Sequence, residues 1–169
     1  MSDWRVPGFT STGSKRPEAL FGSPARMTRA SGCRVWDDAD LEYVDYVMGL
    51  GAVALGYGHP AVNRAAEDAI AAGVVGPLPP VAEEELAEAL AQRIPWLERV
   101  RFLKTGAEAV AAAVRLARVA TGRDEVLGCA YHAWLEWCQG ATEGVPAAVR
   151  GMFAELPFND VDAGRDLIR

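Results

Sequence analysis

The stretch VRFLKTGAEAVAAAVRLARVATGRDEVLGC, residues 100–129, decides the predicted fold. It contains a β-prone run at Val100–Leu103, a turn at Thr105-Gly106, a helical run over residues 107–121 ended by Gly122, and a second short strand at Glu125–Cys129. Two strands joined by a helix at this spacing imply a right-handed crossover, which puts both strands in one parallel sheet. The sequence therefore predicts an α/β fold.

The helical run over residues 107–121 carries few charges. Glu108, Arg115 and Arg118 are its charged residues, and their spacing places them on one narrow stripe. The rest is almost entirely Ala, Val and Leu. We expect such a helix to be buried on most sides, by a sheet on one side and by another helix or a subunit on the other.

The turn Thr105-Gly106-Ala107 is the first candidate binding site. The first turn of a helix has unpaired N–H groups and the positive end of the helix dipole, which suits a phosphate. Gly106 allows close backbone approach, and the Thr105 hydroxyl can add a hydrogen bond. The alternative is a plain Thr N-cap on an ordinary helix. The sequence has no Walker A or GxGxxG motif, so nucleoside triphosphates and dinucleotides have no support.

Aromatic residues follow the second strand, where parallel sheets bind ligands. They are Tyr131, His132, Trp134 and Trp137. A ring in this place can stack on a planar cofactor. The alternative is an apolar loop packed beneath the domain.

Further elements are expected on both sides of this stretch. They are a hairpin of Cys33–Trp36 and Leu41–Val47 around the acidic turn Asp37–Asp40, helices from Pro60 to Gly73 and over 81–94, and a final short strand followed by a helix capped by Asn159 or Asp160. We divide the chain into an arm (1–29), a small-domain hairpin with a glycine-rich segment (30–57) and the first part of a large domain (58–169). A chain of this length should remove roughly 70% of its unfolded surface on folding. The expected strands are nevertheless too few for a parallel sheet covered on both faces, so the domain looks incomplete.

Composition limits the classes of function. The 169 residues carry a net charge of −6 with a pI near 5.0, which argues against nucleic-acid binding. No apolar run reaches the roughly 18 residues of a membrane span. The scattered cysteines Cys33, Cys129 and Cys138 indicate reduced thiols in a cytoplasmic protein. The acidic groups Asp37–Asp40 and Glu83–Glu85 lack the spacing of a metal loop and fit a turn and a helix start.

Several motifs occur together in one order. They are Trp36-Asp37-Asp38 with Tyr43-Val44-Asp45, Gly56-Tyr57-Gly58-His59-Pro60, Thr105-Gly106-Ala107-Glu108-Ala109, Arg115-Leu116-Ala117-Arg118, Thr121-Gly122-Arg123 and Tyr131-His132. From about Ser23 to its end, the sequence resembles class III aminotransferases, which are pyridoxal-phosphate (PLP) enzymes of fold type I. Within them it is most similar to the glutamate semialdehyde aminomutase branch. The resemblance implies an incomplete fold type I structure that covers only the first two-fifths or so of such an enzyme.

The resemblance also implies site residues. Thr105, Gly106 and Ala107 would bind the cofactor phosphate, and Tyr131 would stack on the pyridine ring with His132 beside it. The segment Gly49-Leu50-Gly51 would lie by the substrate pocket.

Three positions depart from the family pattern. The phosphate turn usually reads Ser-Gly-Thr or Ser-Gly-Ser, so Ala107 lacks a hydroxyl group. Ala133 replaces a glycine in the loop after Tyr131. Leu50 stands where the aminomutases often have an aromatic residue, so their substrate cannot be transferred to this chain.

The catalytic residues of the family belong to the part that this chain does not match. They are the lysine that forms the Schiff base and the aspartate that keeps the pyridine nitrogen protonated. The chain has two lysines, Lys15 and Lys104, and we expect neither to serve as the Schiff-base lysine. No catalytic residue is therefore assigned to this chain.

Three hypotheses follow. The chain is the N-terminal half of a split enzyme that shares PLP with a complementary C-terminal chain in a hetero-oligomer and acts on a small amine or amino acid. Alternatively, it is a non-catalytic regulatory subunit, or an inactive fragment of a full-length enzyme. In isolation we expect it to be poorly soluble or self-associated, because apolar surface and a sheet edge would be exposed.

Overall fold

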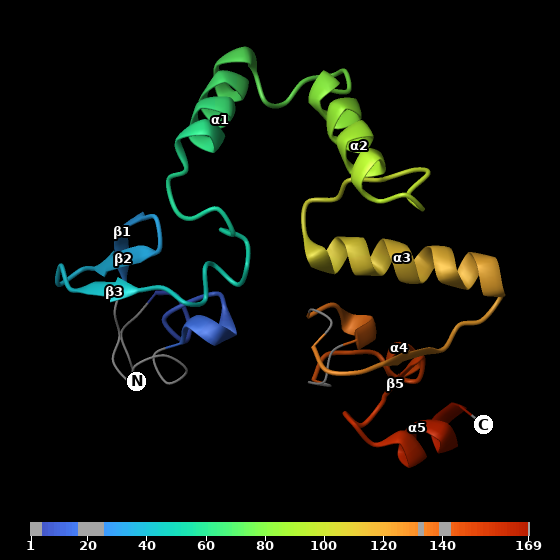
Figure 1. The fold of residues 1–169 in the computed structure, drawn as a ribbon. Coiled ribbons are helices and arrows are strands. Elements are labelled where there is room, and N and C mark those ends of the chain that lie inside the picture. The colour runs from blue at the N-terminus through green and yellow to red at the C-terminus, as the bar shows by residue number, and fades with distance from the viewer. Residues whose placement is uncertain (1–4, 17–25, 132–133, 139–142, 169) are drawn as a thin grey trace. The chain divides into compact units, whose positions relative to one another are not determined.

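The computed structural model describes residues 5–16, 26–131, 134–138 and 143–168. The chain forms two units, Met1–Leu78 and Pro79–Arg169, and each is described by itself (Figure 1). The division expected between residues 57 and 58 stays a prediction. In the described part of the chain, no helix has both the length and the apolar character needed to cross a membrane.

The first unit contains an antiparallel sheet in the order β1-β2-β3. The strands are β1 (Met27–Ser31), β2 (Arg34–Asp37) and β3 (Glu42–Val44), preceded by a 3-10 turn at Gly13–Lys15. The expected hairpin is confirmed by the β2–β3 pairing, in which Val35 lies opposite Tyr43. Strand β1 was not expected from the sequence, although it pairs with β2 along its length apart from an irregularity between Met27 and Arg29.

The acidic turn between β2 and β3 is organised by Asp37, which is buried. Its Oδ1 accepts hydrogen bonds from the N–H groups of Ala39 (2.9 Å) and Leu41 (2.9 Å), and its Oδ2 accepts one from the Tyr43 hydroxyl (2.8 Å). The Leu41 N–H, followed by the Tyr43 hydroxyl, holds the pKa of Asp37 below its ordinary value against the opposing effect of burial. Asp37 therefore has the turn role that the sequence indicated.

The helices before the α/β stretch form as expected. Helix α1 spans Pro60–Ala72, with proline in its first turn, where a missing N–H group does no harm. Helix α2 spans Val81–Arg93 and carries Glu83 and Glu84 in its first turn, where negative charge is favoured by the helix dipole. Neither helix contains a buried residue.

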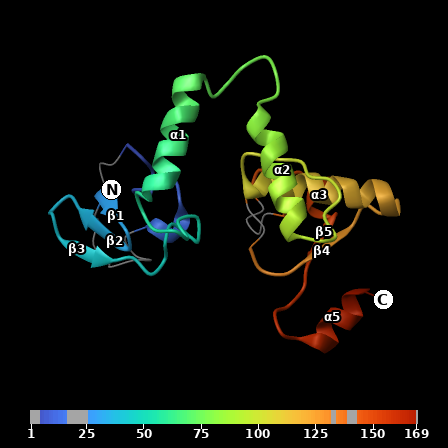
Figure 2. The same ribbon diagram turned by 45° about the horizontal axis from the view of Figure 1, so that its top comes forward.

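The second unit contains a parallel pair of strands, β4 (Val126–Gly128) and β5 (Phe153–Glu155) (Figure 2). Around this pair lie α3 (Gly106–Thr121), a 3-10 turn (Glu136–Cys138), α4 (Ala147–Arg150) and α5 (Val161–Ile168). Asp160 Oδ1 accepts a hydrogen bond from the N–H of Ala163 (3.0 Å), so the cap expected at Asn159 or Asp160 is made by Asp160.

The strand expected at Val100–Leu103 does not form. A strand needs a neighbour for its hydrogen bonds, and among the described residues the only partner of β4 is β5. The crossover therefore runs from β4 to β5 through the 3-10 turn and α4, rather than through α3. The prediction of a parallel sheet is confirmed, but the strands assigned to it were partly wrong.

Helix α3 is not buried on most sides, as had been expected. It contains no buried residue, and Leu116 and Val119 are 70% and 81% exposed. The face through Ala109, Ala113 and Leu116 is uncharged, yet no described element covers it. The composition of this helix therefore predicted a neighbour that the described residues of the second unit do not supply.

The surface area of the chain gives the same result. A compact monomer of this mass exposes roughly 8,000 Å², and two separate domains of half the mass expose roughly 9,700 Å² together. This chain exposes 14028 Å². Its unfolded form would expose roughly 26,000 Å², so folding removes about half of the surface rather than the expected 70%. Among the described residues, Phe9 and Cys138 are the only buried hydrophobic side chains.

Candidate functional site

The turn that starts α3 is held by a reciprocal pair of side chains. Thr105 is the N-cap, and its Oγ1 accepts a hydrogen bond from the N–H of Glu108 (3.2 Å). The Glu108 Oε2 accepts from the N–H (2.9 Å) and from the hydroxyl (3.0 Å) of Thr105. This is a capping box, which fixes the helix start through residues three apart in the sequence.

Two backbone donors remain available at this turn. The N–H groups of Gly106 and Ala107 lie in the first turn, where a helix offers them no acceptor, and no other described residue accepts from them. A Cβ atom placed on Gly106 would have no heavy atom within 4 Å, so the space beside its backbone is open. Two adjacent donors at the positive end of a 16-residue helix fit a phosphate group.

The Thr105 hydroxyl is less available than the sequence suggested. It donates to Glu108 Oε2, so a bound anion could use it only if the Glu108 side chain moved away. The side chain of Ala107 offers no hydroxyl group. The donors that this turn offers without rearrangement are therefore backbone groups.

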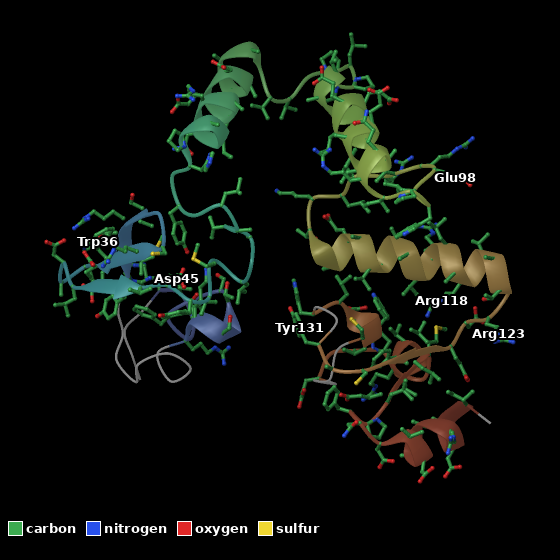
Figure 3. The ribbon with its side chains drawn as sticks, viewed as in Figure 1. Trp36, Asp45, Glu98, Arg118, Arg123 and Tyr131 are labelled. Atoms are coloured by element: carbon green, nitrogen blue, oxygen red, sulfur yellow. The ribbon has the colours of Figure 1, made fainter. Side chains whose placement is uncertain are left out.

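The end of β4 leads directly to the predicted stacking residue. Gly128 is buried, Ala130 has a left-handed backbone (φ 64°), and Tyr131 is 84% exposed. In Figure 3, Tyr131 lies on the side of the second unit where α3 begins, whereas Arg118 and Arg123 lie toward the end of that helix. The Thr105–Ala107 turn and the candidate stacking ring are therefore at the same end of this unit. His132 and Ala133 lie outside the described residues.

An open cavity of about 470 Å³ lies at the carboxyl ends of the two parallel strands. It is lined by Cys129, Ala130, Glu155, Leu156, Pro157 and Phe158. This edge of a parallel sheet is where α/β proteins bind their ligands. The cavity belongs to the same loops that carry Tyr131, but the Tyr131 ring is not part of its lining.

The predicted substrate-side residues belong to the first unit and form a left-handed turn. Met48, Gly49, Leu50 and Gly51 have φ angles of 48°, 60°, 59° and 87°. The Met48 carbonyl accepts from the N–H of Val53 (3.1 Å), which closes the turn. A Cβ atom on Gly49 would lie 2.8 Å from Val53 Cγ2, so a larger residue there would displace the Val53 side chain. Met48 and Leu50 tolerate a conformation that costs an L-residue roughly 1–2 kcal/mol.

Asp45 supports this turn and was missed as a functional candidate. Its Oδ1 accepts from the N–H groups of Val47 (2.8 Å) and Met48 (3.0 Å), and its Oδ2 accepts from the Tyr57 hydroxyl (2.7 Å). The Tyr57 hydroxyl is the main cause that lowers the pKa of Asp45, and backbone N–H groups add to it against the effect of burial. The available signal was an aspartate directly before a glycine-broken run, a pattern typical of a side chain that caps a turn.

The remaining candidates have separate places. His59 precedes α1 as its N-cap residue, without a side-chain hydrogen bond to the helix. Lys15 lies in the 3-10 turn of the first unit, and Lys104 directly precedes the phosphate turn in the second. Among the described residues, no cluster of His, Cys, Asp and Glu has the arrangement of a metal site.

Comparison with known proteins identifies the family that shares these features. A family model described as aminotransferase class-III matches residues 19–152. Over 130 residues, the chain is 41% identical to a glutamate-1-semialdehyde 2,1-aminomutase from Bordetella avium. That match covers 75% of this chain but 30% of the relative, so the chain spans about 30% of the length of the curated relatives it matches.

Solved structures of similar proteins have the same fold. An omega-transaminase from Sphaerobacter thermophilus superposes with a TM-score of 0.79 at 31% identity, covering 88% of this chain and 38% of that one. The FumI protein of Sphingopyxis sp. MTA144, solved as the PLP internal aldimine form, has a TM-score of 0.76 at 32% identity. The superposition includes 84% of this chain and 35% of the FumI protein. The architecture is therefore a part of the PLP-dependent fold type I structure.

Proposed function

The chain belongs to the class-III aminotransferase family, and we propose that it is the N-terminal half of a split PLP-dependent aminotransferase or aminomutase. A second polypeptide, carrying the C-terminal part of the family fold, would supply the Schiff-base lysine and the aspartate at the pyridine nitrogen. The substrate would be a small amine or amino acid. Transamination, amino migration and epimerisation all use the same cofactor chemistry, so the proposal covers this reaction class.

The observation that carries the proposal is the start of α3. This chain spans about 30% of the length of its relatives. It nevertheless has a formed helix start, with two free backbone donors, at the residues that match the family's phosphate turn. Such a turn holds an anion without any rearrangement of the chain.

Each element of the chain would have a separate role in the shared site. The N–H groups of Gly106 and Ala107 would bind the phosphate of PLP, and the exposed Tyr131 ring would cover one face of its pyridine ring. When bound, PLP supplies an electron sink for reactions at the carbon next to the substrate nitrogen. In the first unit, considered by itself, Asp45 holds the Gly49–Gly51 turn, which the family resemblance assigns to substrate binding, in one shape.

A non-catalytic subunit is the second candidate. It is favoured by the engagement of the Thr105 hydroxyl with Glu108 and by the absence of a side-chain hydroxyl at Ala107. Such a subunit would bind and regulate a complete homologue without binding PLP itself.

Coexpression tests the two candidates. The probe is the part of the Bordetella avium aminomutase that lies C-terminal to the segment matched by this chain. We expect the copurified pair to show an absorbance band near 410–430 nm, characteristic of PLP bound through an imine to a lysine. After borohydride reduction, mass spectrometry should find PLP on a lysine of the C-terminal polypeptide. A colourless pair would support the non-catalytic subunit, and label on Lys104 would contradict the assignment of the lysine to the partner.

A charge variant tests the phosphate turn. Gly106→Asp places a carboxylate beside the two backbone donors and should weaken PLP binding by the copurified pair of polypeptides at least roughly tenfold. The substitution should not destabilise α3, because a negative charge is tolerated or stabilising at a helix start. The matched control is Ala82→Asp, which puts the same charge in the first turn of α2. Equal PLP affinity of the two variants would remove the phosphate assignment.

A further inference from the structure

Strand β4 has one paired edge and one open edge. The N–H of Val126 donates to the Met152 carbonyl (2.9 Å), and the N–H of Leu156 donates to the Gly128 carbonyl (2.7 Å). In a parallel pair, alternate residues direct their backbone groups to the neighbour, so Leu127 directs its N–H and C=O to the opposite side. In the described part of the chain, no strand lies on that side.

A groove lies between α3 and β4, and Leu127 is among the residues that line it. We call it the α3–β4 groove, and it has a volume of about 280 Å³. Its lining includes Val114, Ala117, Arg118, Arg123, Val126 and Leu127. The groove combines apolar side chains with the two guanidinium groups of Arg118 and Arg123. The carboxylate of Glu125 is the one negative charge in its lining, so the lining carries a net positive charge.

Arg118 contributes an unpaired donor to the groove. Figure 3 shows this side chain extending from α3 toward the strands, and its Nε donates to the Asp124 carbonyl (2.9 Å). Its Nη2 is buried and has no hydrogen-bond partner among the described residues. A buried charged donor without an acceptor is unfavourable, so this guanidinium group favours an occupant of the groove that carries an acceptor oxygen.

We propose that the α3–β4 groove is the docking site for the complementary C-terminal polypeptide, which adds an extended strand to the open edge of β4 and places a carboxylate on Arg118. This inference rests on the proposed function, because it concerns the same partner. Strand addition satisfies the Leu127 backbone groups, and a carboxylate is the acceptor that best matches a guanidinium group. The positive balance of the groove favours an acidic side chain over a neutral one.

The exposed area agrees with an obligate partner. The chain exposes about 4,000 Å² more than two separate domains of half its mass would. Obligate interfaces bury roughly 2,000–5,000 Å² in total, about half of it on each partner, so this excess is more than enough for one side of such an interface. A second copy of this chain is the less favourable occupant, because it would bring a second Arg118 and Arg123 to the same positive groove.

Binding measurements test the role of Arg118. The chain is titrated with the C-terminal part of the Bordetella avium aminomutase, and the dissociation constant is measured by isothermal titration calorimetry. Arg118→Met keeps most of the apolar length but removes the donor, and should weaken binding at least roughly tenfold. The control Arg115→Met removes an exposed arginine three residues earlier on the same helix and should change the dissociation constant less than twofold. Equal effects of the two variants, or no binding of the wild-type chain, would overturn the proposal.

Hydrogen exchange tests the strand addition without any substitution. The Leu127 amide should exchange rapidly in the free chain and at least a hundredfold more slowly in the complex, whereas the Ala39 amide in the first unit should not change. An unprotected Leu127 amide in the complex would overturn the proposal, and protection of the free chain at high concentration would indicate a second copy instead. If both tests succeed but the complex shows no band near 410–430 nm, the docking site stands and the proposed enzymatic function fails.

Discussion

The two units of this chain differ in how they are held together. In the first unit, Asp37 and Asp45 each organise a turn, and the three strands pair with one another. In the second unit, the described strands form a single parallel pair, β4 and β5, an arrangement that normally depends on further strands and on cover over both faces. This difference shows that contacts close in sequence hold the turns of the first unit, whereas a two-stranded parallel sheet depends on neighbours that the described residues of the second unit do not supply.

The largest expected loss of stability is at Gly56, which lies close to the backbone of Gly32 in the first unit. A Cβ atom on Gly56 would lie 3.1 Å from the Gly32 carbonyl oxygen, and the residue has φ 87°. Gly56→Val should therefore destabilise the first unit by about 2–3 kcal/mol and expose the Gly32 and Tyr57 amides to hydrogen exchange. The control Gly13→Val has no neighbouring atom within 4 Å and an ordinary φ, so it should change stability little. Similar effects of both variants would show that local geometry does not hold this unit.

The next effect concerns Asp45. Asp45→Ala removes the acceptor of the Val47, Met48 and Tyr57 hydrogen bonds and should lower the stability of the turn by about 1–2 kcal/mol. The pKa of Tyr57 is raised chiefly by its hydrogen bond to Asp45, so it should fall back toward the ordinary value near 10. Ultraviolet titration measures this change, and Asp68→Ala on α1 is the control. An unchanged tyrosine titration would mean that the Asp45–Tyr57 bond is absent in solution.

A smaller effect is the pH dependence of the first unit. The folded pKa values of Asp37 and Asp45 lie below the unfolded value near 3.9, so their contribution is present above that pH and is lost as the pH falls through the lowered values. The pKa values of Tyr43 and Tyr57 are raised, so their contribution is present below about pH 10 and is lost above it. Urea unfolding should show a plateau of stability between these limits. A midpoint that changes steadily from pH 5 to 9 would contradict this assignment.

The smallest effect tests the second unit. Leu116→Lys should change the stability of the isolated chain by no more than about 0.5 kcal/mol, because this side chain is 70% exposed. A leucine in a filled core would instead be worth about 2–5 kcal/mol. Light scattering should show less self-association of the variant. A large loss of stability would mean that α3 is covered in the isolated chain and that the contrast between the units is smaller than described.

Much of the local structure could be predicted from the sequence. Helices α1, α2 and α3 begin and end near the expected residues, because proline, glycine and capping residues act within a few positions. The Thr105 turn was predicted together with its two interpretations, and the structure shows that the N-cap and the free donors coexist. The roles of Gly106, Tyr131 and Leu50 in a cofactor or substrate site stay predictions.

The errors concern contacts between distant residues. The run at Val100–Leu103 has strand-forming side chains but no neighbour to pair with, and α3 has the composition of a buried helix but no cover. The composition of a segment indicates which environment would stabilise it. It does not indicate whether the same chain provides that environment. Strand β1 was missed for the opposite reason. Its own polar sequence does not predict a strand, but the neighbouring strand β2 provides the backbone hydrogen-bond partners that make it one.

The capping box of α3 has a consequence for the order of assembly. Thr105 and Glu108 are three residues apart, so their contact forms on the timescale of helix formation, within about a microsecond. Docking of a second chain is limited by diffusion and takes milliseconds to minutes. In the proposed split enzyme, an anion could therefore bind the finished helix start before the second chain arrives, and a cofactor bound first would act as a template for assembly.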